Sequence, residues 1–180
     1  MERDVTRIAL FAALIAVLGL VPKIDLVSGV PITAQSLGIM LSGAVLGSKR
    51  GALAVLLFLA VVSAGVPLLS GGRGGVAVFV GPTAGYLVGF PIAAFVIGLI
   101  VERVHRAPWL TCFVACVIGG ILVLNGLGIV GMAIILQKSL PEASLLALPF
   151  LVGDLIKSAL AATIAQTIKR MRPERLGVGS

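Results

Sequence analysis

Charged side chains are scarce in this chain of 180 residues. Asp, Glu, Lys and Arg make up 12% of it, about half the share found in soluble globular domains. With only two cysteines, the chain is not a disulfide-rich secreted scaffold, and its 59% hydrophobic content excludes a disordered chain. A soluble domain of this size could not bury so much apolar surface, so an ordinary cytosolic enzyme is excluded as well. The composition predicts an all-α integral membrane protein whose surface is solvated by lipid.

Apolar segments divide the chain into six predicted transmembrane helices. A helix that crosses a membrane needs about 20 mostly apolar residues. Segments of this kind cover residues 8–21, 33–46, 51–65, 82–101, 110–136 and 147–168. The second is short and the fifth is long, so we expect one to be half-buried and the other to be tilted or kinked. Because six spans use most of the chain, we predict a single transmembrane domain over residues 1–180.

The first apolar segment has two possible interpretations. Arg3 and Arg7 precede a run of 14 apolar residues, as in a signal peptide. No clear Ala-x-Ala cleavage site follows before Pro22, so we interpret the segment as a span. Its alanines recur at small-x-x-x-small spacing, which lets another helix of this bundle or of another subunit approach closely. These residues are Ala9 and Ala13, and Ala12 and Ala16.

The basic residues predict an orientation, because Lys and Arg in short loops stay on the cytoplasmic side. One side has Lys23, Arg73 and Lys138, and Lys157 lies within the sixth span. The other side has ten: Arg3, Arg7, Lys49, Arg50, Arg103, Arg106, Lys169, Arg170, Arg172 and Arg175. We therefore expect a multi-pass protein of the cell membrane with both termini in the cytoplasm. The bias also explains the net charge of +7 without a nucleic-acid partner.

In this orientation the second, fourth and sixth helices begin on the outer side, with three positive dipole ends pointing outward. Their first residues lie around Thr33, Pro82–Thr83 and Ala147. If the helices pack together, these residues ring an outward-facing cavity that favours an anionic group on a ligand.

Asp154 and Lys157 are the acid and the base within the apolar run of the sixth span. Each costs roughly 2.5–3.5 kcal/mol at the centre of a membrane helix on insertion scales. Their i, i+3 spacing puts both on one face, near enough to interact. One interpretation is a ligand site that presents an acceptor and a donor, and the other is a structural salt bridge that faces the bundle interior.

A glycine-rich loop with one basic residue, Arg73, precedes the fourth span. It does not match the phosphate-binding pattern G-x-x-x-x-G-K-[ST]. We interpret it as an external loop whose Arg73 can close over a carboxylate. Tyr86 and Phe90, four residues apart on the following helix, share a face. They are candidates for ligand contact, and core packing or interfacial anchoring is the alternative.

The remaining polar residues give weaker indications. Gln35 is polar in an apolar stretch and is a candidate for the same cavity, whereas we expect Asn125 to hydrogen-bond to a neighbouring helix. We interpret Cys112 and Cys116 as small buried hydrophobes, and His105 as a solvated loop residue. The sequence offers no Ser–His–Asp set, metal cluster or paired carboxylates, so neither catalysis nor a metal site is predicted.

Two motifs together resemble the BioY family, the biotin-binding S components of energy-coupling factor transporters. One is the run from Gly81 to Phe90, G-P-T-A-G-Y-L-V-G-F, and the other is D-L-I-K from Asp154 to Lys157. The family often has Gly where this chain has Ala84. The resemblance covers nearly the whole chain and implies a six-helix S-component fold with biotin held near the extracellular surface.

The resemblance also implies roles for particular residues. Asp154 and Lys157 would contact the ureido ring, whose N–H groups and carbonyl match one acceptor and one donor. Phe79, Tyr86 and Phe90 are candidates for apolar walls around the rest of biotin. The valerate carboxylate would lie near helix N-termini and Arg73.

The partners that the resemblance implies are a transmembrane T component and two ATPase subunits. The alanines of the first helix resemble the surface that S components offer to the T component. No cofactor is expected, and ATP would be hydrolysed by the partners. Two alternatives stay open, an S component for another vitamin and a non-transporting membrane scaffold. Function without the energy-coupling module is a further possibility that the sequence leaves open.

Overall fold

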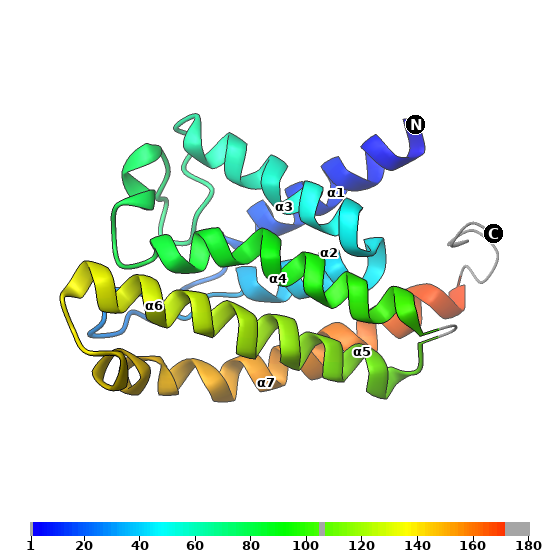
Figure 1. Ribbon diagram of the computed structural model, residues 1–180. Helices are drawn as coiled ribbons and strands as arrows, with labels where there is room; N and C mark the ends of the chain where they lie inside the picture. Colours follow the sequence, from blue (N-terminus) through cyan, green and yellow to red (C-terminus); the bar gives the residue numbers. More distant parts are fainter. Residues whose placement is uncertain (1, 105–106, 172–180) are drawn as a thin grey trace.

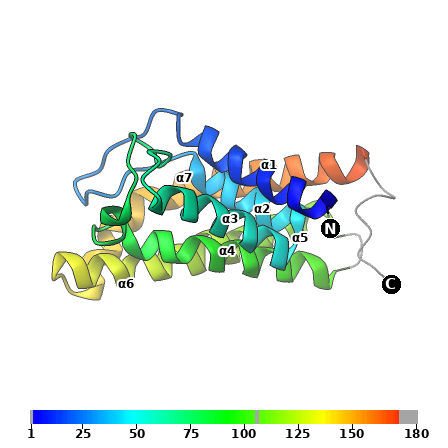
Figure 2. The ribbon, with the colours of Figure 1, turned by 90° about the horizontal axis from the view of Figure 1, so that it is seen from above.

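Apolar helices that run along a common axis make up most of the computed structural model, which describes residues 2–104 and 107–171 (Figure 1 and Figure 2). His105, Arg106, Arg172 and Arg175 lie outside the described residues. The helices are α1 (Glu2–Leu18), α2 (Gln35–Leu46), α3 (Ser48–Ser63), α4 (Ala84–Arg103), α5 (Trp109–Cys116), α6 (Leu124–Leu136) and α7 (Leu140–Met171). A short 3-10 helix, η1 (Val76–Phe79), precedes α4, and a π-helical segment, η2 (Val117–Val123), joins α5 to α6.

Each predicted span corresponds to a helix or to helices joined end to end. The long fifth span is the stretch α5–η2–α6, in which the π segment interrupts the α-helical hydrogen bonding. By length and composition, α4, the stretch Trp109–Leu136 and α7 can each cross a membrane. The described helices thus support a membrane protein, and the number of crossings stays a prediction.

The start of the last helix was predicted wrongly. The helix α7 begins at Leu140 rather than near residue 147, and the Glu142 side chain reaches back to Ser139 at its start, as in one half of a capping box. The backbone N–H and the hydroxyl of Ser139 donate to Glu142 Oε2 at 2.9 and 2.8 Å. The apolar run that was used to place the span is interrupted in this first part of the helix by Pro141, Glu142 and Ser144, although the pattern Ser-x-x-Glu is present in the sequence.

The helix α2 is short and enclosed by the rest of the bundle. It has 12 residues, and most of them are buried against α1, α3, α4 and α7. Its first residues lie in the middle of the bundle, and its last residue is followed by a single glycine, Gly47, before α3 begins. Because α2 stops short of one end, the loops at residues 19–34 and 64–83 complete that end (Figure 1).

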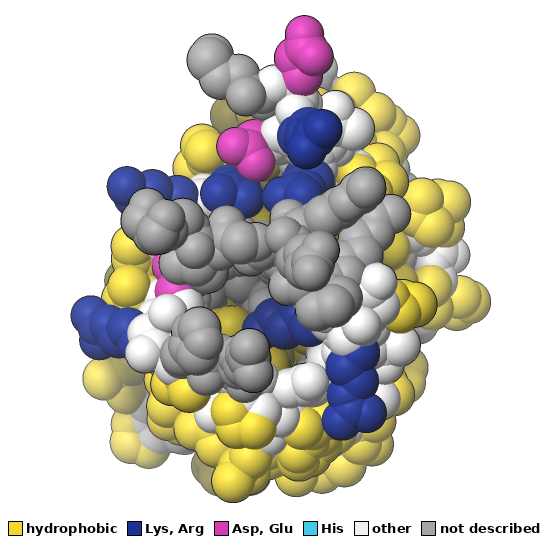
Figure 3. All heavy atoms as spheres, turned by 90° about the vertical axis from the view of Figure 1, so that its right-hand side faces the viewer, with side chains coloured by type: hydrophobic (Ala, Val, Ile, Leu, Met, Phe, Trp, Pro, Cys, Tyr) yellow, Lys and Arg dark blue, Asp and Glu magenta, His cyan; other side chains and the backbone are white. Residues whose placement is uncertain are grey.

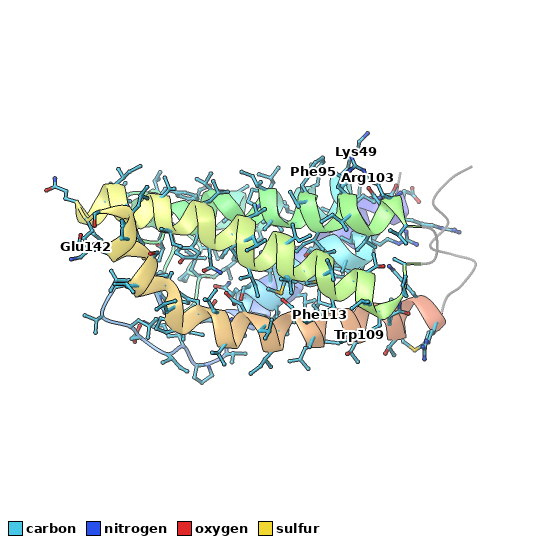
Figure 4. All side chains as sticks on the ribbon, turned by 60° about the horizontal axis from the view of Figure 1, so that its bottom comes forward. Lys49, Phe95, Arg103, Trp109, Phe113 and Glu142 are labelled. Atoms are coloured by element: carbon cyan, nitrogen blue, oxygen red, sulfur yellow. The ribbon has the colours of Figure 1, made fainter. Side chains whose placement is uncertain are left out.

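The two ends of the bundle differ in charge. The start of α1 and the end of α7 lie at the same end, where Lys and Arg side chains gather (Figure 3). Figure 4 shows Lys49 and Arg103 at this end and Glu142 at the other. Arg50 lies 3.3 Å from Asp4 and ties α3 to α1. We call this the basic end, and the opposite end the loop end.

Glycines allow α4 and α6 to cross at close range. A Cβ atom on Gly131 would lie 2.6 Å from Cα of Gly85, and one on Gly85 would lie 2.5 Å from the carbonyl oxygen of Leu127. Such backbone-to-backbone approaches are available only to glycine. The crossing sets the distance between the helices that carry Tyr86 and Asn125.

The first prediction concerns this crossing. We expect Gly131→Ala to destabilise the protein by about 1–3 kcal/mol, because the added methyl group overlaps the backbone of α4. The measurement is the thermal unfolding midpoint in detergent. The matched control is Gly126→Ala on the same helix, where an added Cβ meets nothing within 4 Å. An equal midpoint for both variants would contradict the close crossing.

Candidate ligand-binding site

A cavity of about 540 Å³, its open mouth included, lies between the helices toward the loop end. Residues from α2, α4, α6, α7 and the two long loops line it. They are Val30, Pro31, Thr33, Gln35, Ser36, Leu69, Arg73, Thr83, Tyr86, Leu87, Phe90, Leu124, Phe150, Asp154 and Lys157.

An ion pair forms the most polar part of the cavity wall. Lys157 Nζ lies 3.0 Å from Asp154 Oδ1, and the side chains are 15% and 7% exposed. Ser36 at the start of α2 completes a triangle: its hydroxyl accepts from Lys157 Nζ at 2.9 Å and donates to Asp154 Oδ1 at 3.4 Å. Mutual pairing and the added hydrogen bonds offset the desolvation of the two charges.

The ion pair extends into a network across four helices. Asn125 on α6 donates from Nδ2 to Asp154 Oδ2 at 3.2 Å. Tyr86 on α4 donates its hydroxyl proton to Asn125 Oδ1 at 3.4 Å. The expectation that Asn125 bonds to a neighbouring helix is therefore confirmed, and its partner is the buried acid of the cavity.

A count of hydrogen-bonding positions shows which acceptors of Asp154 and donors of Lys157 are still unused by the protein. A carboxylate has about four acceptor positions, and an ammonium group has three N–H donors. Among the described residues, Asp154 accepts from Lys157, Ser36 and Asn125, and Lys157 donates to Asp154 and Ser36. About one acceptor position on Asp154 and one donor on Lys157 remain for a ligand.

Aromatic side chains form an apolar wall beside the ion pair. Tyr86 and Phe150 lie with their ring centroids 5.7 Å apart, and Phe90 follows Tyr86 by one helical turn. All three line the cavity. Phe79 is not among the lining residues and instead packs against the hydrophobic core from η1, so the structure does not bring it to the cavity.

Gln35 lines the cavity, but its amide bonds to the protein backbone. The side chain is almost fully buried, with 2% of the residue exposed. Its Nε2 donates to the carbonyl oxygens of Ile15 and Leu68 at 3.2 and 3.1 Å, and its Oε1 accepts from the N–H of Ser70 at 3.0 Å. Gln35 thus fastens the loop that carries Leu69 and Arg73 to the ends of α1 and α2.

Arg73 and Thr33 lie at the mouth of the cavity. Arg73 is held by an isolated β-bridge with Leu69 and by a 3.4 Å bond from its Nε to the Ser70 carbonyl. Across residues 2–104 and 107–171, no carboxylate forms an ion pair with it. Its terminal N–H groups therefore suit a carboxylate on a ligand.

Two of the three predicted helix starts reach the cavity. Thr33 and Thr83, next to the first residues of α2 and α4, line it. Ala147 does not, because α7 begins at Leu140 and Ala147 is buried in the core of the bundle. The predicted ring of three helix N-termini is wrong in this respect.

The alanines of α1 divide between two faces. Ala9 and Ala13 are exposed, whereas Ala12 is buried and Ala16 packs against the core, where α1 meets α2 and α3. The pair Ala12 and Ala16 therefore serves packing within the bundle, and the pair Ala9 and Ala13 lies on its surface.

Sequence reasoning missed Ser36 and Phe150 as cavity residues. Ser36 follows Gln35 directly, and a single serine at a helix start carries little signal. Phe150 lies four residues before Asp154 on the same face of α7, a spacing that could have indicated it. Cys112 and Cys116 are buried, form no disulfide and lie away from the cavity, and the described residues hold no cluster of three metal-ligating side chains.

An apolar helical bundle with a cavity between its helices and an ion pair in the cavity wall is the arrangement of a membrane protein that can take a small molecule between its helices. The sequence profile of the BioY family matches residues 2–174. The chain belongs to the BioY family, a family of transporter components rather than enzymes.

Similar proteins cover almost the whole chain. The chain is 53% identical to the biotin transporter BioY of Rhodobacter capsulatus over 98% of both chains. It is 47% identical to the biotin transporter BioY of Rhizobium etli over 92% of both. A crystal structure of the S component for biotin from an ECF-type ABC transporter matches with a TM-score of 0.90 and 30% identity, over 94% of this chain and 92% of that one. The fold is thus that of an S component.

The second prediction concerns Gln35. We expect Gln35→Leu to lower the thermal unfolding midpoint and to speed proteolysis of the loop at residues 64–75, because the Leu68 carbonyl and the Ser70 N–H lose their partner. The Ile15 carbonyl keeps its bond from the N–H of Gly19. Each unsatisfied group costs about 1–3 kcal/mol. Gln35→Glu should be at least as harmful, since a carboxylate oxygen would face two carbonyl oxygens.

The control for Gln35 is Gln166→Leu, which removes one bond, from Gln166 Nε2 to the carbonyl oxygen of Ala107 at the basic end. In the Gln166→Leu variant, protease should cleave the loop at residues 64–75 at the wild-type rate. If Gln35→Glu were as stable as the wild type, the assigned bonds of the amide would be incorrect.

Proposed function

We propose that this protein is the biotin-binding S component of an energy-coupling factor uptake transporter. Biotin is the transported substrate, and no cofactor takes part. The observation that carries the proposal is the Asp154–Lys157 ion pair, largely buried in the wall of a cavity between the helices. Close relatives are named biotin transporters, and the matching crystal structure is of an S component for biotin.

The ureido head group of biotin suits this ion pair. A ureido group has two N–H donors and a carbonyl acceptor, and it carries no charge. Asp154 would accept from an N–H group and Lys157 would donate to the carbonyl oxygen, each through the position that the protein leaves unused. Such charge-assisted hydrogen bonds are short and strong where water is excluded.

The remainder of biotin is apolar up to its carboxylate. The ring that contains sulfur would lie against Tyr86, Phe90 and Phe150. The valerate chain would extend toward the mouth, where Arg73 and the start of α2 near Thr33 favour its negative charge. In this orientation the head group is deepest and the carboxylate is nearest to the loops.

We propose six membrane crossings, with both termini in the cytoplasm and the cavity facing the outside. The basic residues at the end shared by the start of α1 and the end of α7 support this orientation (Figure 3). The loop end would then face the medium from which biotin is captured, over a single transmembrane domain that comprises residues 1–180.

The partners in this proposal are a T component and two ATPase subunits, which would supply the energy of ATP hydrolysis. The exposed Ala9 and Ala13 on α1 would let a T-component helix approach closely between the larger exposed side chains of Val5 and Val17. Ala12 is excluded from this surface by its burial.

Two other functions compete with this proposal. An S component for another vitamin would use the same fold but would need other groups around its ligand. In a non-transporting scaffold, the Asp154–Lys157 pair would be structural alone. The open acceptor and donor positions beside a cavity favour a ligand over a scaffold.

The third prediction tests the function directly. We expect purified wild-type protein to bind biotin with a Kd below micromolar. Asp154→Asn and Lys157→Met should each weaken binding by about 100-fold or more, since each leaves the other charge buried without its partner. Isothermal titration calorimetry measures all three.

The control for these variants is Lys138→Met, which removes a charge from the exposed turn before α7. Its affinity should equal that of the wild type. If the wild-type protein fails to bind biotin below micromolar concentrations, the proposed function is wrong. If the wild type binds biotin and both variants bind it equally well, the assignment of Asp154 and Lys157 to the site is wrong, but the proposed function remains supported.

The fourth prediction concerns orientation. In a Cys112→Ala, Cys116→Ala background, we expect Val76→Cys at the loop end to react with a membrane-impermeant thiol reagent in intact cells. Lys49→Cys at the basic end should react only after the cells are permeabilised. Both side chains are exposed in the structure, so access to the reagent depends on the membrane. The reverse pattern would overturn the outward-facing cavity.

A further inference from the structure

Asn125 lies behind the cavity wall and contacts the acid that the ligand would meet. It is 4% exposed and is not among the lining residues. Its amide bridges Tyr86 Oη and Asp154 Oδ2 at 3.4 and 3.2 Å. Any effect of Asn125 on a ligand must therefore pass through Asp154 or Tyr86.

The chemistry of the three groups fixes the direction of these hydrogen bonds. An ionised carboxylate only accepts, so the NH₂ group of Asn125 must face Asp154 and its carbonyl oxygen must face Tyr86. The Tyr86 hydroxyl then has to donate. Its proton is engaged with Asn125, and Tyr86 presents its ring to the cavity as an apolar wall.

The same contacts fix the orientation of the Asp154 carboxylate. Lys157 and Ser36 bond to Oδ1, and Asn125 bonds to Oδ2 from the opposite helix. A carboxylate held at both oxygens cannot rotate freely. The remaining acceptor position is therefore held in one direction before a ligand arrives, which lowers the entropic cost of binding.

We propose that Asn125, with Tyr86 behind it, is a positioning residue that makes Asp154 a fixed acceptor for the ureido N–H group and so sets the head-group specificity of the site. The inference rests on the proposed function of biotin binding. It adds a determinant on α6, and it assigns the Tyr86 hydroxyl to Asn125 rather than to the ligand.

The fifth prediction tests this assignment with Asn125→Leu, Tyr86→Phe and the double variant. We expect Asn125→Leu to weaken biotin binding by about 10-fold to 100-fold, because a hydrogen bond to a charged group is lost. Tyr86→Phe should weaken it less. The double variant should bind no more weakly than Asn125→Leu alone, because the Tyr86 hydroxyl acts through Asn125.

Binding of a second ligand, desthiobiotin, distinguishes a positioning role of Asn125 from a packing role. Desthiobiotin keeps the ureido group and the carboxylate but lacks the sulfur bridge. Asn125→Leu should weaken both ligands by the same factor, whereas Phe150→Leu in the apolar wall should change their ratio. Thermal unfolding midpoints of all variants, measured without ligand, identify any that are misfolded.

Each remaining outcome decides against the inference. Wild-type affinity in a folded Asn125→Leu variant would exclude a positioning role. Losses that add in the double variant, or a ratio of the two ligands that changes with Asn125→Leu, would indicate a packing role only. Should the wild type itself not bind biotin, the proposed function fails and this inference falls with it.

Discussion

The structure depends on one buried carboxylate. Asp154 lies in the middle of α7, where an unpaired charge would be costly, and its stability requires partners from outside its own helix. Lys157 supplies the counter-charge, Ser36 supplies a hydroxyl from α2, and Asn125 supplies an amide from α6. Because Tyr86 on α4 bonds to Asn125 in turn, the need to satisfy one acid ties four helices together around the cavity.

The same arrangement links the interior of the bundle to its loops. Ser36 and Gln35 are adjacent at the start of α2, and their side chains bond to different parts of the protein. Ser36 contacts the ion pair, and Gln35 contacts the backbone of α1 and of the loop that carries Arg73. The first turn of α2 thus bonds both to the Asp154–Lys157 ion pair and to the loop that carries Arg73. This shared anchor fixes the distance between the ion pair and the loop.

The sequence allowed the ion pair to be predicted because charge is rare within apolar runs, and it allowed most helix positions to be predicted from hydropathy. The predictions failed where a proline and a few polar residues interrupt the apolar run of a helix, as at the start of α7. They also failed where a role depends on contacts distant in sequence. Nothing near Gln35 indicates that its partners are Leu68 and Ser70, and nothing near Asn125 indicates Asp154. Phe79 and Phe150 are equally aromatic, and only the packing of η1 and α7 decides which one faces the cavity.

The shortness of α2 has a consequence for permeability. Its 12 residues span roughly 18 Å, well below the hydrocarbon thickness of about 30 Å. The protein between the cavity and the basic end is therefore about as deep as this one helix. When water fills the cavity, the layer of protein that separates this water from the basic end is only about as thick as α2 is long. Met40, Ile39 and Ile97 are fully buried in this layer, and dense apolar packing of this kind opposes the passage of ions.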